Sequence, residues 1–330
     1  MSVVAPEKIL KELADLWVTT GKEGGEADTQ GVLRACSLTL VVISESADDP
    51  HSLGETIAAL MPEHPARTIL IRLTGAGDRA LDQRVYAQCW MPFGQRRQIC
   101  CEQVEITCAD GALADLPSVV LPLAIPDLPL VVWSRCTRLL AMPEFRAIAD
   151  MATRLVLDST CRPDTRQALE RVSSEIASGR LVADLAWTQL TRWREMLAEV
   201  FENRQNLARL TGDVRVTVGD GGAASARALY MAAWMQDSLR SLPVAVEAAI
   251  SSSPQPAAFF VELAADGLTV RLERRDERLV TTVNGLSQST HLPQPDNYLL
   301  MREELGIAAR DPSFERALAL AVRLAYATDK

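Results

Sequence analysis

The sequence predicts an α/β fold with an N-terminal, mostly parallel sheet flanked by helices and a C-terminal α/β or α+β domain. Strand-like apolar runs alternate with helix-like periodic segments through the first half, which is typical of a parallel sheet covered by helices. This alternation breaks after Asp158. The length of 330 residues also exceeds the roughly 100–200 residues of one domain, so we expect two domains, 1–160 and 161–330.

The first half is expected to begin with a helix that ends at Gly21. Its apolar residues recur at helical spacing: Ile9, Leu10, Leu13, Leu16 and Trp17. A continuous apolar run at residues 38–43 follows, with the pattern of a strand covered on both faces. Residues 67–73 predict a second strand, and residues 130–133 and 155–158 predict two short buried strands. Residues 52–61 have a helical pattern, and residues 99–106 alternate in part as a further strand.

The second half combines capped helices with alternating strands. Asp164 and Asp184 can cap helix N-termini, the first helix ending at Gly179 and the second running to residue 201. Alternating valines predict a half-buried strand at 214–218, followed by a glycine turn and a helix over 223–239. The remaining expected elements are strands at 259–263, 268–273 and 279–283 and a helix at 313–326.

Composition excludes several classes of function. The sequence is 48% hydrophobic with a net charge of −9, and it has no basic run, so we expect no nucleic-acid partner. The most apolar segment, 116–133, is interrupted by four prolines, and the start of the chain carries charges within its apolar pattern. We therefore expect a cytoplasmic protein without a membrane partner. The seven cysteines form no CxxC pair, which favours reduced thiols over a disulfide framework.

Residues suited to catalysis are few. The three histidines, His51, His64 and His291, lie in turns or at a helix start, and no GxSxG motif is present. No cluster of cysteines or histidines has the spacing of a zinc site. Asp158 ends a strand, where α/β folds place many sites, but a single carboxylate defines no mechanism. We therefore predict no catalytic residue, no metal and no cofactor.

A glycine cluster leaves one alternative open. Gly219 to Gly222 join a strand to a helix, and the amides at Gly221 and Gly222 could bind an anion at the helix start. Neither GxGxxG nor GxxxxGK[ST] is present, so a plain tight turn explains the glycines equally well. The alternative function is a sugar-phosphate or nucleotide-binding protein or enzyme, with a sugar phosphate as a weak effector.

Several motifs together resemble one family. They are LPLAIPDLPLVVW at 121–133, RLVLDS at 154–159 and DLAWTQLTRWRE at 184–195, with HPAR at 64–67 and ALYMAAWM at 228–235 in support. In this order they are similar to the OpcA family, the glucose-6-phosphate dehydrogenase assembly proteins. The resemblance implies two domains, no catalysis of its own, and binding to glucose-6-phosphate dehydrogenase as an allosteric activator that supports NADPH production in the oxidative pentose phosphate pathway.

The same motifs contain the candidate partner-binding residues. Prolines fix the backbone beside an acidic turn residue, and tryptophan and arginine are favoured anchors of protein interfaces. The candidates are Asp127, Pro129, Trp133, Trp187, Trp193 and Arg194. In the alternative interpretation, Trp187 and Trp193 belong to a core between the two domains and are held by salt bridges of Arg194 and Glu195.

Overall fold

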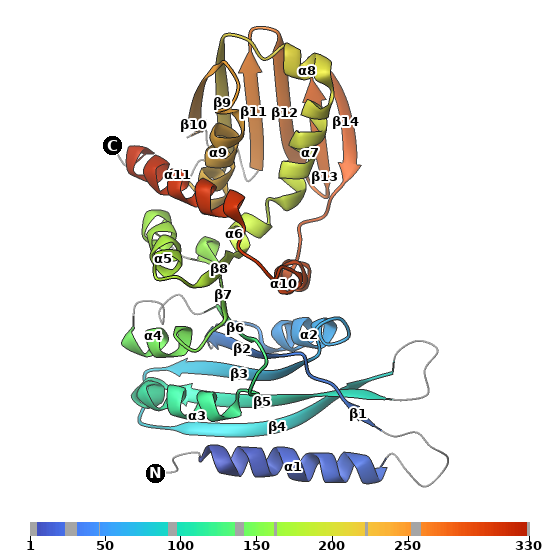
Figure 1. The fold of residues 1–330 in the computed structure, drawn as a ribbon, viewed down its shortest axis with the longest axis vertical. Helices are drawn as coiled ribbons and strands as arrows, with labels where there is room; N and C mark the ends of the chain where they lie inside the picture. The colour runs from blue at the N-terminus through green and yellow to red at the C-terminus, as the bar shows by residue number, and fades with distance from the viewer. Residues whose placement is uncertain are drawn as a thin grey trace. The chain divides into compact units, whose positions relative to one another are not determined.

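The computed structural model describes residues 5–23, 32–45, 47–91, 98–135, 142–161, 164–221, 224–251 and 259–328 (Figure 1). The chain forms two compact units. Unit 1 comprises Met1–Leu157, Arg180–Ala183 and Asn297–Ile307, and unit 2 comprises Asp158–Gly179, Asp184–Asp296 and Ala308–Lys330. The α/β class is confirmed. Among the described helices, none is both long and apolar enough to span a bilayer.

Unit 1 is built on a largely parallel sheet. Its strands are β1 (Leu33–Arg34), β2 (Leu38–Glu45), β3 (Ala66–Gly75), β4 (Leu81–Trp90), β5 (Ile99–Ala109), β6 (Leu130–Ser134), β7 (Arg154–Leu157) and β8 (Leu181–Asp184). The order is β1-β5-β3-β2-β6-β7-β8, with β4 antiparallel to β5. The strands β5-β3-β2-β6-β7-β8, numbered along the chain, read 3-2-1-4-5-6, which is the order of dinucleotide-binding domains.

Helices of unit 1 cover this sheet. They are α1 (Pro6–Glu23), α2 (Pro50–Leu60), α3 (Leu116–Leu123), α4 (Pro143–Ala149) and α10 (Asn297–Gly306), with a short 3₁₀ turn at Asp110–Asp115. Helix α1 packs on β4 and α3, whereas α2 packs on α10. Strand β2 is buried from Leu38 to Ser44, as its continuous apolar run predicts for a central strand.

Unit 2 contains a six-stranded sheet with helices on one face (Figure 1). Its strands are β9 (Asp213–Asp220), β10 (Ala245–Ile250), β11 (Phe259–Ala265), β12 (Leu268–Arg275), β13 (Arg278–Val283) and β14 (Leu286–His291), in the order β10-β9-β11-β12-β13-β14. Its helices are α5 (Thr165–Ala177), α6 (Leu185–Thr188), α7 (Thr191–Glu202), α8 (Arg204–Ala208), α9 (Ala226–Leu239) and α11 (Pro312–Thr328). Among the described strands of this sheet, β9 and β10 pair in parallel and the other neighbours pair in antiparallel fashion.

Two expectations are corrected by the structure. The single helix expected to run from Asp184 to residue 201 is instead the end of β8 followed by two helices, because a turn at residues 189–190 separates α6 from α7. The prediction that the cysteines are reduced thiols is wrong for Cys89 and Cys100, which form a disulfide. The antiparallel register of β4 and β5 places these two residues directly opposite each other. Cys136 lies outside the described residues.

Candidate functional site

The topological switch point of unit 1 is the place where a dinucleotide would bind in this architecture. The strand order reverses between β2 and β6, which are parallel neighbours. In open α/β sheets, ligands bind outside the carboxyl ends of the strands at this point, with phosphates on the N-terminus of the first helix. In this chain that helix is α2, which follows β2.

The N-terminus of α2 is already occupied by a carboxylate of the chain itself. Asp49 caps the helix, and its side chain accepts hydrogen bonds from the backbone amides of His51 at 3.0 Å and Ser52 at 3.4 Å. Asp48 pairs with Arg135 at 2.9 Å and also accepts a hydrogen bond from the Glu45 amide at 3.0 Å. Two carboxylates therefore lie where the pyrophosphate of a dinucleotide would need free amides and a glycine-rich turn.

The predicted partner-binding residues of unit 1 lie in two different environments. Asp127 is an exposed turn residue with φ of 64°, a conformation that aspartate tolerates better than most residues, and Pro129 is also exposed. Trp133 is fully buried on β6, and its indole nitrogen has no hydrogen-bond partner among the described residues. Asp127 and Pro129 could touch a partner directly, whereas Trp133 could act only by shaping the unit.

Asp184 organises the buried centre of unit 2. Its carboxylate caps α6 and accepts hydrogen bonds from the amides of Ser159 and Ala186, both at 3.0 Å. The hydroxyl of Tyr230 donates to its other oxygen at 2.8 Å, and both side chains are fully buried. Burial raises the pKa of Asp184 to about 6, although the hydrogen bonds of Ser159 and Tyr230 oppose this shift. Asp184, the first residue of the DLAW motif, thus links Ser159, Ala186 and Tyr230 by hydrogen bonds, and we call these four residues the Asp184 hub.

The tryptophans of the same motif are buried, and the partners described below belong to unit 2 itself. Trp187 is 5% exposed, donates to Asp311 at 3.0 Å and packs against Phe314. Trp193 is 3% exposed and packs edge-on against Phe259, with ring centroids 4.7 Å apart. A role of these two tryptophans in partner binding stays a prediction, and their burial restricts it to an indirect one.

Arg194 is the half-buried candidate of this group. Its guanidinium lies 3.6 Å from the ring centroid of Trp187 and donates to the Trp187 carbonyl at 2.9 Å. Glu195, which was expected to hold the tryptophans together with Arg194, instead pairs with Arg192 at 2.6 Å. A cation stacked on an aromatic face stabilises the local packing, which gives Arg194 a structural role as well.

The glycine turn before α9 has a structural explanation for two of its residues. A Cβ atom on Gly219 would lie 2.2 Å from the ring of Phe260, and Gly221 has φ of 64°. Gly222 lies outside the described residues. Asp220 accepts hydrogen bonds from Ser225, the N-cap of α9, at 2.6 Å and from Arg227 at 2.8 Å. A carboxylate therefore already lies beside this helix start, which weighs against a second anion there; anion binding by Gly221 and Gly222 stays a prediction.

Reactive side chains are scarce in the described part of the chain. His51 pairs with Glu55 on the exposed surface of α2, and His291 ends β14. Burial raises the pKa of Cys101 and that of Cys108 to about 11, so both thiols stay protonated and are poor nucleophiles at neutral pH. No group of three or more His, Cys, Asp or Glu among the described residues could hold a metal ion.

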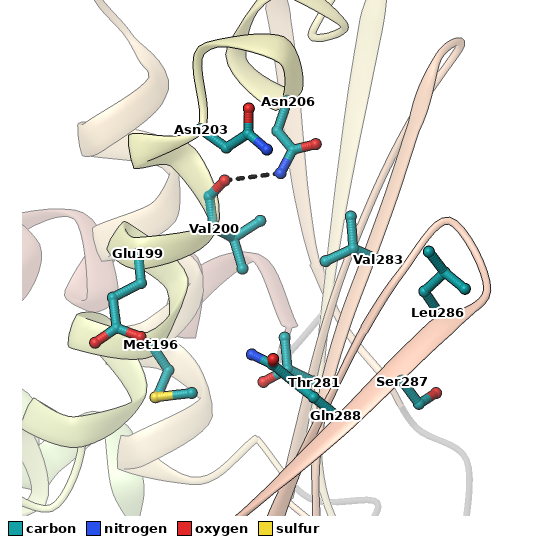
Figure 2. Close-up of a pocket in the computed structure, with 10 residues that line it drawn as sticks. All are labelled: Met196, Glu199, Val200, Asn203, Asn206, Thr281, Val283, Leu286, Ser287 and Gln288. Atoms are coloured by element: carbon teal, nitrogen blue, oxygen red, sulfur yellow. Dashed lines mark hydrogen bonds between the residues drawn. The ribbon is translucent and has the colours of Figure 1, made fainter.

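A groove of about 460 Å³ in unit 2 was not predicted from the sequence (Figure 2). Helices α7 and α8 form one wall, and strands β13 and β14 form the other. The turn between these strands is Asn284-Gly285, with φ of 48° and 83°, the conformation of a type I′ hairpin. Asn-Gly is the strongest short-range hairpin signal, and it could have revealed β14.

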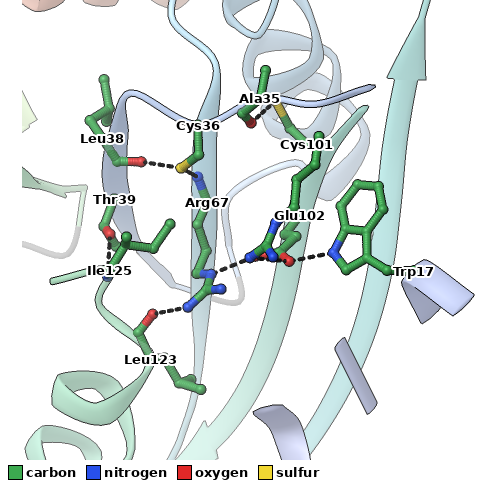
Figure 3. A network of polar contacts seen from close by, with 11 residues as sticks. Trp17, Ala35, Cys36, Leu38, Thr39, Arg67, Cys101, Glu102, Leu123 and Ile125 are labelled. Atoms are coloured by element: carbon green, nitrogen blue, oxygen red, sulfur yellow. Dashed lines mark hydrogen bonds and ion pairs between the residues drawn. The ribbon is translucent and has the colours of Figure 1, made fainter. Parts of the chain in front are cut away.

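A buried ionic network in unit 1 was also missed (Figure 3). Glu102 on β5 is 4% exposed and accepts hydrogen bonds from Arg67 at 2.6 Å and Trp17 at 2.5 Å, with Arg34 at 2.7 Å. Arg67 also donates to the Leu123 carbonyl at 2.8 Å. The arginine of the HPAR motif therefore links β3 to β5 and α3, which is a stabilising role.

Known proteins with related sequences match over most of the chain. Residues 57–174 match the model of the glucose-6-phosphate dehydrogenase subunit N-terminal domain, and residues 180–318 match that of its C-terminal domain. A relative from Synechocystis sp. named "Putative OxPP cycle protein OpcA" is 25% identical over 58% of this chain and 40% of its own length. One from Nostoc punctiforme with the same name is 27% identical over 56% and 40%. The chain spans about two fifths of these relatives' length.

Solved structures share the fold at low sequence identity. An NAD binding oxidoreductase from Klebsiella pneumoniae matches with a TM-score of 0.50 and 12% identity, covering 88% of this chain and 96% of that one. A 3-ketoreductase from Actinomadura kijaniata matches with a TM-score of 0.50 and 11% identity, covering 88% and 97%. These likenesses concern the fold alone. The two domain models, which match residues 57–174 and 180–318, show that the chain belongs to the OpcA family of glucose-6-phosphate dehydrogenase subunits.

Proposed function

We propose that this chain is a non-catalytic assembly factor and allosteric activator of glucose-6-phosphate dehydrogenase, which acts in the cytoplasm and supports NADPH production in the oxidative pentose phosphate pathway. Two findings support the proposal. Both family models carry the description of a glucose-6-phosphate dehydrogenase subunit, and the curated relatives are named for the oxidative pentose phosphate cycle.

The observation that carries the non-catalytic part is the capped start of α2. A dehydrogenase of this architecture holds its dinucleotide on free amides at that helix, whereas here Asp49 accepts hydrogen bonds from two of them. Asp48, the neighbouring carboxylate, is paired with Arg135. A pyrophosphate would therefore have to displace Asp49 from these amides, which argues against dinucleotide binding at this helix and supports a non-catalytic role.

An activator of this kind must discriminate between conformations of its target. It can shift the dehydrogenase toward its active state only by the difference between its affinities for the two states. Equal affinity for both would leave the activity unchanged however tightly the chain bound. We therefore expect the chain to bind more tightly to the active oligomer than to the dissociated enzyme.

Complex formation tests the proposal. The full chain is mixed with glucose-6-phosphate dehydrogenase of the same organism, and the mass of the complex is measured by size-exclusion chromatography with light scattering. We expect a complex of defined stoichiometry and a larger share of the assembled dehydrogenase. An unrelated NADP-dependent dehydrogenase serves as the control and should not associate. Separate elution of the two proteins at micromolar concentrations would contradict the proposal.

A further inference from the structure

Strand β14 is an edge strand whose free side is open. It is the last strand of the unit 2 sheet, and all six of its residues are exposed. The Leu292 amide donates to the Glu277 carbonyl at 2.8 Å, so these two residues form a hydrogen-bonded pair just outside β13 and β14. In an antiparallel ladder, hydrogen-bonded and non-hydrogen-bonded residue pairs alternate along the strands. Residues 286, 288 and 290 therefore hydrogen-bond to β13, whereas the backbone groups of Ser287, Ser289 and His291 point toward the free edge.

This edge lacks the usual protection against strand pairing. Natural edge strands are blunted by charged residues, prolines or bulges. Strand β14 reads LSQSTH, and its register with β13 is continuous over all six residue pairs. The opposite edge strand, β10, carries the exposed Glu247. Of the outward backbone groups of β14, the Ser289 carbonyl accepts one long hydrogen bond from Arg278, at 3.4 Å.

The groove lies directly beside this open edge. On the helix side of the sheet, Leu286 is 81% exposed, and Gln288 points with Thr281 toward α7 (Figure 2). Thr281 is 2% exposed, and its hydroxyl has no hydrogen-bond partner within the described ranges. The opposite wall is formed by α7, which contributes Met196 and Val200. An apolar exposed side chain and an unsatisfied hydroxyl thus flank the same groove.

The charge of the groove indicates what it can accept. Among the described residues that line it, Glu199 is the only charged one, and Glu202 lies one turn further along the exposed side of α7. None of these described lining residues is a lysine or arginine, so they offer a phosphate no counter-charge. A segment with a lysine or arginine beside an apolar side chain matches both the carboxylate and the apolar wall.

From these observations we infer that β14 and its groove bind an extended basic segment of the partner protein, which adds to the sheet as a seventh strand. Backbone hydrogen bonds to Ser287, Ser289 and His291 would supply affinity, and the alternate side chains of the segment would enter the groove beside α7. The inference rests on the proposed function, because the partner it names is glucose-6-phosphate dehydrogenase.

Matched variants of the full chain test the inference by titration calorimetry against the dehydrogenase. Ser289→Pro removes an outward amide that β13 does not use, and Ser289→Ala is its control, since both lose the contact of the serine hydroxyl with Arg278. Glu199→Lys reverses the charge of the groove, and Glu247→Lys makes the same change on the opposite edge strand. We expect Ser289→Pro and Glu199→Lys to raise Kd about tenfold or more, and each control less than about threefold.

Hydrogen exchange supplies a second readout on the wild-type complex, with slower exchange expected at the amides of Ser287, Ser289 and His291. If Ser289→Pro fails to fold, the Kd of Glu199→Lys and the exchange pattern of the wild-type complex test the inference without it. If the wild-type chain binds and both variants have the same Kd as their controls, the inference is wrong and the proposed function still stands. If the wild-type chain does not bind, both are wrong. If the chain forms a dimer that Ser289→Pro abolishes, a second copy of the chain occupies the edge of β14, and the inference is again wrong.

Discussion

Replacing Tyr230 with phenylalanine tests whether the Asp184 hub stabilises unit 2. The change removes one buried hydrogen bond of 2.8 Å to a carboxylate and leaves one carboxylate oxygen without this donor. A hydrogen bond to a charged group contributes about 1.5–3 kcal/mol, and a loss of this size lowers Tm by about 3–12 °C in a domain of 150–250 residues. Tyr326→Phe is the matched control, because Tyr326 is 51% exposed where it contacts Glu170, and we expect less than about 0.5 kcal/mol there.

The pH dependence of this effect follows from the raised pKa of Asp184. The pKa in the folded state is about 6, above the ordinary value of 3.8, so the folded chain binds the proton more tightly than the unfolded chain. The free energy of unfolding therefore falls as pH rises from about 4 to about 6 and is level above that range. Removing the Tyr230 hydroxyl raises the pKa of Asp184 further, since this hydrogen bond lowers it. The destabilisation should thus be larger at pH 8 than at pH 6.

Thermal unfolding followed by tryptophan fluorescence measures both variants at the two pH values. We expect Tyr230→Phe to lower Tm more than Tyr326→Phe, with a gap that widens from pH 6 to pH 8. Equal shifts for the two variants, or a shift of Tyr230→Phe that does not change with pH, would refute the assignment of Asp184 as a buried, ionised hub.

The remaining predictions concern stability in both units. Glu102→Ala should destabilise unit 1 by about 3–5 kcal/mol, because it leaves Arg67 buried without its carboxylate, and Glu55→Ala on exposed α2 should cost less than about 0.5 kcal/mol in the same urea titration. If Glu102→Ala lowers the free energy of unfolding by no more than Glu55→Ala does, the ionic network contributes little to the stability of unit 1. Gly219→Ala should destabilise unit 2 by about 1–3 kcal/mol through the clash with Phe260, and the cost should shrink in a Phe260→Ala background. If Gly219→Ala destabilises the Phe260→Ala variant as much as it destabilises the wild-type chain, Gly219 is required for a reason other than the contact with Phe260.

The parts of the fold that were predicted are those with strong local patterns. The apolar run at 38–43 lies in the central strand β2, where burial on both faces favours a continuous apolar sequence. Residues 67–73 lie in β3, which is also buried over most of this stretch. Strand β4 was missed because none of its residues is fully buried and polar residues interrupt its apolar ones. Strand β14 was missed because it is exposed on both faces, and only the Asn284-Gly285 turn marks it. Polar patterns of this kind do not separate an edge strand from a loop.

The roles of the motif residues depend on contacts that no local pattern contains. Arg67 and Glu102 are 35 residues apart, and Asp184 and Tyr230 are 46 apart. The spacing of Trp187 and Trp193 indicated a helix but did not indicate which surface they would face. The motifs identified the family well because they encode the buried core, and for the same reason they did not locate the open edge of β14.

The proposed role of this chain, activation of another enzyme, is tested by the rate of NADPH formation from glucose 6-phosphate and NADP. The rate is measured with the chain alone, with glucose-6-phosphate dehydrogenase alone, and with both at a subsaturating substrate concentration. We expect no turnover by the chain alone and a faster rate for the mixture than for the dehydrogenase. Turnover by the chain alone, or a mixture no faster than the dehydrogenase, would contradict the proposed role.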